Sequence, residues 1–197
     1  MKNLILTTFF IMTGTVAFSQ ALNKTKEIMN TQSYPKSLAD YNDFKDLVAE
    51  VESHRAERLI SLETFLKMSQ EENVVILDTR SDFRYNRKHL KGAIHLDFTD
   101  FTQTNLWELI PPDPNTRILI YCNNNFDGDQ TDFASKISIP QKNMETQILS
   151  NRKPIMLALN IPTYINLYGY GYRNIYELDE LVNVNDPRIE FEGTEVK

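Results

Sequence analysis

Cys122 is the only cysteine in the chain, and it directly follows residues 117–121, an apolar run typical of a buried strand. A strand end would fix its backbone, and the asparagines that follow favour a tight loop, because asparagine tolerates left-handed conformations. Backbone N–H groups curled around the sulfur would favour a thiolate, so we predict a nucleophile with a pKa below about 8.5. A buried apolar residue would fit the same position. The predicted loop consists of Asn123, Asn124, Asn125, Phe126 and Asp127.

Five short apolar segments that could position this cysteine have the character of strands. They lie at residues 58–60, 74–77, 93–96, 117–121 and 174–178. Helices are predicted after Ser61 and at residues 81–88, 100–109 and 162–168. Strands separated by short helices predict a parallel sheet that is covered by helices on both faces.

An amphipathic helix is predicted before this alternation, within residues 40–57. Phe44, Leu47, Val48 and Val51 would share one face of that helix, and charged residues would occupy the other. An apolar stripe of this kind is stable only when it is buried, so we expect it to pack on the main domain. Residues 20–57 are therefore interpreted as a polar lead and a helical extension.

The N-terminus has the order of an export signal. Lys2 precedes an apolar stretch at residues 4–16, and Ala17 and Ser19 provide the small residues of a cleavage site. We predict that residues 1–19 are removed and that the mature protein is periplasmic or secreted. The apolar stretch is short for a bilayer, so we expect no membrane span. A lone cysteine in an exported protein is either buried and inert or kept reduced for a purpose.

Composition excludes several classes of function. The 197 residues include 27 acidic and 21 basic side chains, a net charge of −6, which argues against nucleic acid as a partner. His54, His89 and His95 lack the spacing of metal ligands, so we expect no metal site. No glycine pattern of a phosphate or dinucleotide loop is present, so we expect no cofactor.

The segment at residues 127–160 is too long for a simple return from strand to helix. Loops of this length are usually functional or disordered, and this one is rich in apolar side chains that are unfavourable in water. We expect it to cover Cys122 as a lid or to present an apolar face to a partner. Residues 183–197 form an acidic tail with little pattern.

Four motifs in this order resemble the rhodanese-like domain: VILDTR at 75–80, HLKGAI at 89–94, ILIYC at 118–122 and GYRNIYEL at 171–178. The resemblance covers residues 58–182 and implies an α/β fold, a five-stranded parallel sheet flanked by helices. It also implies that Cys122 opens a loop that holds a persulfide, with sulfur taken from a donor such as thiosulfate and passed to a nucleophile. Asp78 and Arg80 would lie near the carboxyl end of the sheet, as supporting residues or as an ion pair that fixes the backbone.

The loop departs from the pattern of that family. No basic residue occurs between Cys122 and Lys136, whereas three aspartates do, and this should disfavour capture of a dianion. Related phosphatases of the fold need an arginine shortly after the cysteine, and none is present. Arg152 and Lys153 could supply charge only by folding back.

These observations predict sulfur transfer or persulfide chemistry at Cys122, with a small sulfur-containing anion or a thiol as substrate. The alternative is a non-catalytic rhodanese-like module that docks a protein partner or a small ligand. A cysteine phosphatase of the same fold ranks third.

Overall fold

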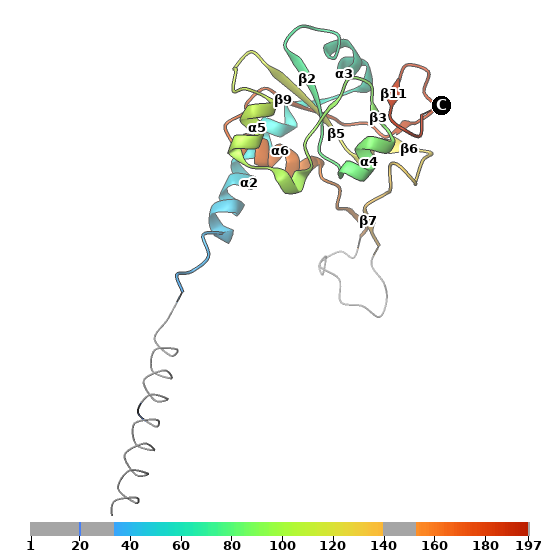
Figure 1. The fold of residues 1–197 in the computed structure, drawn as a ribbon. Coiled ribbons are helices and arrows are strands. Elements are labelled where there is room, and N and C mark those ends of the chain that lie inside the picture. Colours follow the sequence, from blue (N-terminus) through green and yellow to red (C-terminus); the bar gives the residue numbers. More distant parts are fainter. Residues whose placement is uncertain (1–19, 21–33, 140–152, 197) are drawn as a thin grey trace, which may run out of the picture. The chain divides into compact units, whose positions relative to one another are not determined.

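The computed structural model describes residue 20, residues 34–139 and residues 153–196 (Figure 1). Asn42–Lys197 form one compact unit, which contains the sheet and the cysteine. The predicted export signal, residues 1–19, lies outside the described residues, as do residues 140–152 of the long segment. In the described part of the chain, no helix is both long and apolar enough to cross a bilayer.

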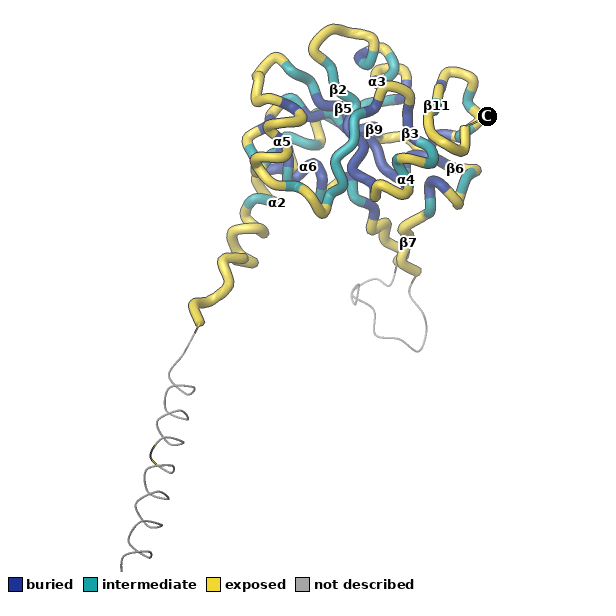
Figure 2. The backbone as a smooth tube through the Cα atoms, in the orientation of Figure 1, coloured by how far each residue is buried: buried dark blue, intermediate teal, exposed yellow. Residues whose placement is uncertain are grey.

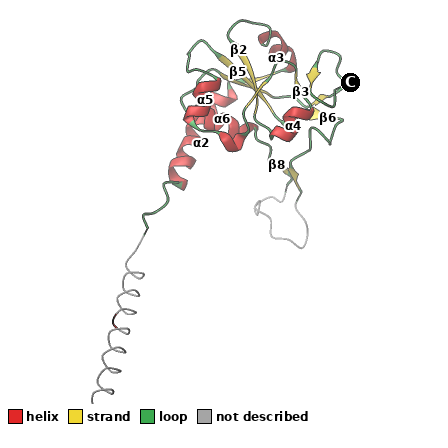
Figure 3. Cartoon of the chain, in the orientation of Figure 1, coloured by secondary structure: helices red, strands yellow, loops and turns green. Residues whose placement is uncertain are grey.

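The centre of this unit is a five-stranded parallel sheet with the order β1-β9-β5-β2-β4. Figure 3 shows two of its strands, β2 and β5, among the helices. Its strands are β1 (Leu59–Ile60), β2 (Val74–Asp78), β4 (Ile94–His95), β5 (Arg117–Tyr121) and β9 (Ile175–Leu178). The prediction of a parallel α/β sheet is confirmed. In β5, residues 118–121 are all buried, as expected for a central strand that is covered on both faces.

Helices cover both faces of the sheet. They are α2 (Tyr41–Ala56), α3 (Leu62–Met68), α4 (Asp82–Arg87), α5 (Gln103–Leu109) and α6 (Asn160–Gly169), with the 3₁₀ turns η1 (Phe98–Asp100) and η2 (Asn123–Asn125). Alternate residues of β5 face opposite layers. Leu119 and Tyr121 pack in a cluster with α3, whereas Ile118 and Ile120 pack in a cluster with α2, α5 and α6.

Local sequence explains where several helices begin. Ser61 caps α3 by accepting the backbone N–H of Thr64 at 3.3 Å. Helix α6 begins at Asn160, two residues before the predicted start, because Pro162 lies in its first turn, where the missing N–H costs nothing. The predicted helix at 100–109 is shorter, since η1 ends at Asp100 and α5 starts at Gln103.

The amphipathic helix α2 is present, but only part of its apolar stripe is buried. Val51 is 1% exposed and Leu47 packs against the α6 side of the core. Phe44 and Val48 are 48% and 39% exposed, and most of α2 has the colour of exposed residues in Figure 2. The expectation that the whole stripe packs on the domain is therefore wrong for its first turns.

Three further strand pairs lie outside the main sheet. They are β3 (His89–Leu90) with β11 (Phe191–Glu192), β6 (Phe126–Asp127) with β10 (Val182–Asn183), and β7 (Ile137–Ser138) with β8 (Ile155–Met156). The first and last pairs are antiparallel, and β6 and β10 are parallel.

The C-terminal tail has more structure than its sequence indicated. Its Phe191 ring lies 5.4 Å from Phe126 and 5.5 Å from Phe133, measured between centroids. Gly193, at φ 133°, passes the Arg87 carbonyl so closely that a Cβ atom would lie 2.3 Å from its oxygen. The interpretation of residues 183–197 as an unpatterned tail is corrected, because strands of two residues leave no detectable period.

A buried ionic network joins the strand ends. The Arg80 guanidinium contacts the Asp78 carboxylate at 2.6 Å, and both side chains are essentially inaccessible. Arg80 also donates to the carbonyl oxygens of Lys88 at 2.7 Å and Asp132 at 3.0 Å. Tyr121 donates its hydroxyl proton to Asp78. The network therefore connects β2, β5, the start of β3 and the long segment.

Replacing Arg80 with methionine should lower the free energy of unfolding by about 3–5 kcal/mol, because it leaves the Asp78 carboxylate buried without its cation. Urea unfolding monitored by circular dichroism measures the change. The matched control is Arg188→Met, which removes an exposed pair with Asp186 and should leave stability nearly unchanged. Equal losses in the two variants would contradict the importance assigned to the buried network.

Candidate active site

Cys122 lies at the carboxyl end of the central strand β5 and is 1% exposed. The backbone N–H of Leu159 donates to its Sγ at 3.4 Å, and α6 begins at the next residue. A helix N-terminus carries a partial positive charge, so it favours an anion at this position. The sulfur and the helix meet although 37 residues of sequence separate Cys122 from Leu159.

Only part of the predicted loop surrounds the sulfur. The N–H of Leu159 contacts the sulfur, and the backbone N–H groups of the turn Asn123–Asn125 face it from the other side. Phe126 and Asp127 form β6, and the Phe126 ring packs 4.6 Å from Phe133 in the core, measured between centroids. The segment that follows Cys122 thus makes one 3₁₀ turn and then leaves the site.

The prediction of a lowered pKa at Cys122 is wrong. Burial raises the pKa of the thiol, because a thiolate would lose most of its hydration. The N–H groups of Leu159 and Asn123 lower the pKa, as does the charge of Arg80, while the Asp78 carboxylate raises it. Desolvation outweighs the donors, so the thiol is protonated at neutral pH.

Asn125 organises the backbone on both sides of the cysteine. Its Oδ1 accepts the Cys122 N–H at 2.9 Å and the Nδ2 of Asn160 at 3.0 Å. Its Nδ2 donates to the carbonyl oxygens of Leu178 at 2.7 Å and Glu180 at 3.2 Å. One buried amide therefore joins the cysteine loop, the first turn of α6 and the end of β9.

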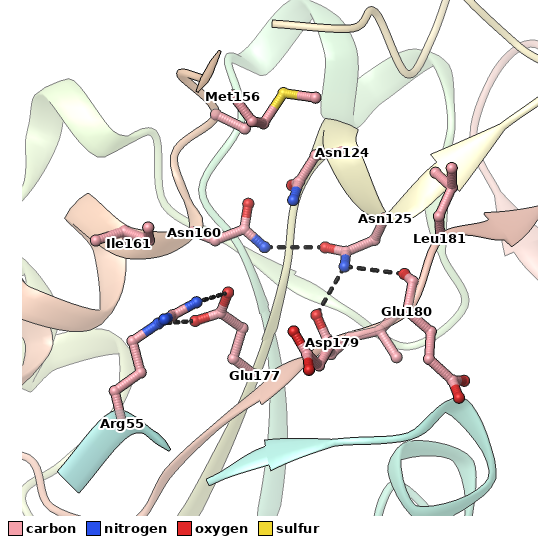
Figure 4. Close-up of a pocket in the computed structure, with 12 residues that line it drawn as sticks. Arg55, Asn124, Asn125, Met156, Asn160, Ile161, Glu177, Asp179, Glu180 and Leu181 are labelled. Carbon is pink, nitrogen blue, oxygen red and sulfur yellow. Dashed lines mark hydrogen bonds and ion pairs between the residues drawn. The ribbon is translucent and has the colours of Figure 1, made fainter. Parts of the chain in front are cut away.

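A pocket of about 290 Å³ lies beside this amide network (Figure 4). Asn124, Asn125 and Asn160 line one part of it, and the Arg55–Glu177 ion pair lines another. Arg55 binds both oxygens of Glu177, at 2.6 and 2.7 Å. Sequence reasoning missed Arg55, Glu177 and Asn160. The two charged residues lie 122 positions apart and carry no local motif.

The remaining candidate residues lie near the site or outside it. Asp78 and Arg80 influence the sulfur through their charges and form the ion pair described above. Lys153 is exposed, and Arg152 lies outside the described residues. In the ranges that the structure describes, no group of three histidine, cysteine, aspartate or glutamate side chains could hold a metal ion.

The described chain is a parallel α/β domain with a single cysteine at the end of its central strand. These two features are the basis for a comparison with known protein families. Residues 61–180 match the family model of the Rhodanese-like domain, so the chain belongs to the rhodanese-like family. Residues 58–182 carry the four motifs from which the resemblance was inferred.

Two curated relatives are tRNA uridine(34) hydroxylases, from Streptococcus sanguinis (strain SK36) and from Streptococcus gordonii (strain Challis). Each is 30% identical over 83 residues, which are 41% of this chain. The match spans only 25% of each relative.

Among solved structures, the BH2092 protein from Bacillus halodurans has a TM-score of 0.42 and 15% identity, over 75% of this chain and 85% of that one. A variant of EanB in complex with hercynine has a TM-score of 0.38 and 18% identity, over 61% and 23% of the two chains.

Alkylation of native Cys122 by iodoacetamide should be more than about tenfold slower at pH 8 than alkylation of the urea-unfolded chain, because the buried thiol is protonated and covered. The rate should increase with pH beyond the pKa of a free thiol. Mass spectrometry of quenched samples measures it. Native alkylation as fast as that of the unfolded chain would contradict the burial and the raised pKa.

The stability of the protein should depend on the same thiol. Because its folded pKa is raised, its contribution is complete below the unfolded pKa of about 8.5 and is lost as pH rises through the folded pKa. The free energy of unfolding of the wild-type protein should therefore fall as pH rises from neutral to above about 8.5, and Cys122→Ala should show a smaller fall. Parallel urea titrations across this range test the prediction, and identical slopes in the two proteins would contradict it.

Asn125→Ala should lower the free energy of unfolding by about 1–3 kcal/mol, because it leaves the buried N–H of Cys122 and carbonyl of Leu178 without their partner. Asn124→Ala is the control, since the Asn124 Oδ1 is buried without a hydrogen bond among the described residues. Urea unfolding compares the two variants. A larger loss in Asn124→Ala would refute the organising role of Asn125.

Proposed function

We propose that the protein carries sulfur as a persulfide on Cys122 and passes it to a thiol. The observation that supports this most directly is the N–H of Leu159, which contacts Sγ at 3.4 Å at the start of α6. A persulfide anion placed there would be stabilised by this donor and by the helix dipole. Membership of the rhodanese-like family agrees with this chemistry.

The proposed reaction needs no redox partner. The Cys122 thiolate attacks the outer sulfur of a small persulfide, R–S–SH. A new S–S bond forms on Cys122 while the S–S bond of the donor breaks, and the donor leaves as the thiolate R–S⁻. A second thiolate then takes the outer sulfur and returns the electron pair to Cys122, so both steps are balanced exchanges.

Burial sets a condition on this reaction. With Cys122 1% exposed, a donor reaches Sγ only after the backbone of residues 123–125 and 158–159 moves apart. Opening also removes the desolvation that raises the pKa of the thiol. Access and acidity are therefore coupled, and the open form is the reactive one.

Incubation with inorganic polysulfide, a probe for small persulfide donors, should add the mass of one sulfur atom to Cys122. The Cys122→Ser variant should not gain it. Cyanide should then remove the added sulfur as thiocyanate. Absence of the added sulfur at any pH at which the native fold persists would refute persulfide transfer.

The Leu159 donor can be tested separately. Leu159→Pro removes the N–H, and a φ of −81° at this position is close to the proline value. Persulfide formation should become about tenfold slower, because a hydrogen bond to a charged group is lost. Leu159→Ala is the matched control, because it keeps the N–H. Equal rates in the two variants would contradict a role for this donor.

A second candidate function is a non-catalytic binding module. The buried, protonated thiol favours it, as does the exposed apolar surface beside β7 and β8. Ile137, Ile139, Ile155 and Leu157 are 47%, 65%, 41% and 57% exposed. A chain that gains no sulfur from polysulfide, but that loses association when Ile139 and Leu157 are replaced by serine, would support this candidate.

A further inference from the structure

The pocket beside Cys122 has an unusual surplus of hydrogen-bond acceptors. It lies at the carboxyl ends of β5 and β9, the edge at which open α/β sheets bind ligands. Two amide oxygens in its lining, Asn124 Oδ1 and Asn160 Oδ1, are buried without a hydrogen-bond partner in the described chain. Asn160 is only 4% exposed. A buried acceptor without a partner is costly, which indicates that a donor is missing.

The orientation of the Asn125 and Asn160 amides follows from the hydrogen bonds between them and around them. Asn125 Oδ1 must be an oxygen, because it accepts the backbone N–H of Cys122. Asn160 can approach that oxygen only with its NH₂ group, and does so at 3.0 Å. The Asn160 oxygen is therefore the atom left over in the pocket lining (Figure 4). The acceptor is fixed by the network and does not depend on an arbitrary choice of amide rotamer.

The charges in the lining also favour a cation. Four titratable residues line the pocket: Arg55, Glu177, Asp179 and Glu180. Arg55 and Glu177 neutralise each other in a two-point ion pair. Glu180 accepts the backbone N–H of Leu62 at 2.7 Å, and Figure 4 shows its carboxylate turned away from the amide group.

Asp179 remains as the charge available to a ligand. Its carboxylate is exposed and makes no hydrogen bond within the described ranges of the chain, although it interacts with the charge of Arg55. It lies between the Arg55–Glu177 pair and Glu180 (Figure 4). Together with the two amide oxygens it offers acceptors and a negative charge. A protonated primary amine supplies three donors and a positive charge, whereas thiosulfate and other anions supply neither.

The rest of the lining suits a short apolar stem. Met156, Ile161 and Leu181 contribute apolar side chains from β8, from α6 and from the turn between β9 and β10. A pocket of about 290 Å³ is at the lower limit of small-molecule sites. The dimensions therefore match an alkylammonium ion of a few carbons.

We propose that this pocket binds the ammonium group of a small amine through Asn160, Asn124 and Asp179. A second part rests on the proposed function: the thiol that accepts sulfur from Cys122 carries a primary amine. Asn160 directly follows Leu159, whose N–H contacts Sγ, and Asn125 binds the N–H of Cys122, so an amine held here is separated from the cysteine by these residues alone.

The transfer step is balanced for such an acceptor. The thiolate of ⁻S–R–NH₃⁺ attacks the outer sulfur of the Cys122 persulfide. The S–S bond to Cys122 breaks, a new S–S bond forms on the acceptor, and the electron pair stays on the Cys122 sulfur. The ammonium group takes no part in bond making. It holds the acceptor in place.

Binding is tested with n-butylammonium, with n-butanol and butyrate as neutral and anionic analogues. In NMR titrations of the isotope-labelled wild-type protein, butylammonium should bind at least about tenfold more tightly than either analogue and should shift the side-chain amide signals of Asn160 and Asn125. Equal binding of the three probes, tighter binding of butyrate, or shifts confined to other regions would overturn the proposal.

Two variants make this test specific. Asp179→Asn keeps the shape of the pocket and should weaken butylammonium binding by about tenfold, because a charge-assisted hydrogen bond becomes a neutral one. Asp100→Asn removes the same charge from an exposed position outside the pocket and should change nothing. Equal effects of the two variants would show that net charge alone is responsible, and would overturn the site.

Sulfur transfer is then measured from the Cys122 persulfide to cysteamine, mercaptoethanol and mercaptopropionate. Cysteamine should have the lowest KM, and Asp179→Asn should raise that KM with little change in kcat. If no persulfide forms, the proposed function fails, while the butylammonium titration still decides the amine site. If persulfide forms but the three thiols react alike, the pocket is not the acceptor site and the inference is wrong.

Discussion

The buried Arg80 guanidinium is the constraint on which the rest of the domain depends. An ionised group without water requires partners on every side, and Arg80 obtains them from three segments of the chain: the nearby Asp78 carboxylate, the Lys88 carbonyl and, 52 residues away, the Asp132 carbonyl. Its Cζ atom also lies 4.5 Å from the centroid of the Phe133 ring. These requirements can be met together only when β2, β3 and the long segment after Cys122 are assembled around it.

This requirement explains how the domain accommodates a long segment between its cysteine and the following helix. The first part, through Phe133, is held in the core by Arg80 and by the aromatic cluster with Phe191. The last part returns to the site, where Leu159 meets the sulfur and Asn160 meets Asn125. The described portion between them, around β7 and β8, is exposed. The extra residues of this segment thus lie at the surface. The end of the segment still brings Leu159, at the start of α6, into contact with the Cys122 sulfur.

The features predicted from sequence are those that depend on local pattern. Continuous apolar runs identified β2 and β5. Because asparagines follow the second run, Cys122 was correctly placed at the end of a strand. Nonlocal features were missed. Asn125 has the same sequence context as Asn123 and Asn124, and only its partners at Leu178 and Asn160 distinguish it. The error in the direction of the Cys122 pKa has the same origin, because neighbouring amides can be counted in the sequence, whereas the extent of burial cannot.

The burial that raises the pKa of Cys122 would also make the proposed sulfur-transfer site selective. A protonated thiol beneath the surface reacts slowly with any reagent that merely collides with the protein, since the thiolate is the reactive form. A ligand that binds near Asn160 and Asn125 contacts residues that hold the loop closed, because Asn125 joins the N–H of Cys122 to the first turn of α6. Reactivity would then increase where a ligand with the matching donors competes for those amides. In this arrangement the Asp179 carboxylate would contribute to specificity, because it disfavours small anions and attracts the cation proposed for the pocket.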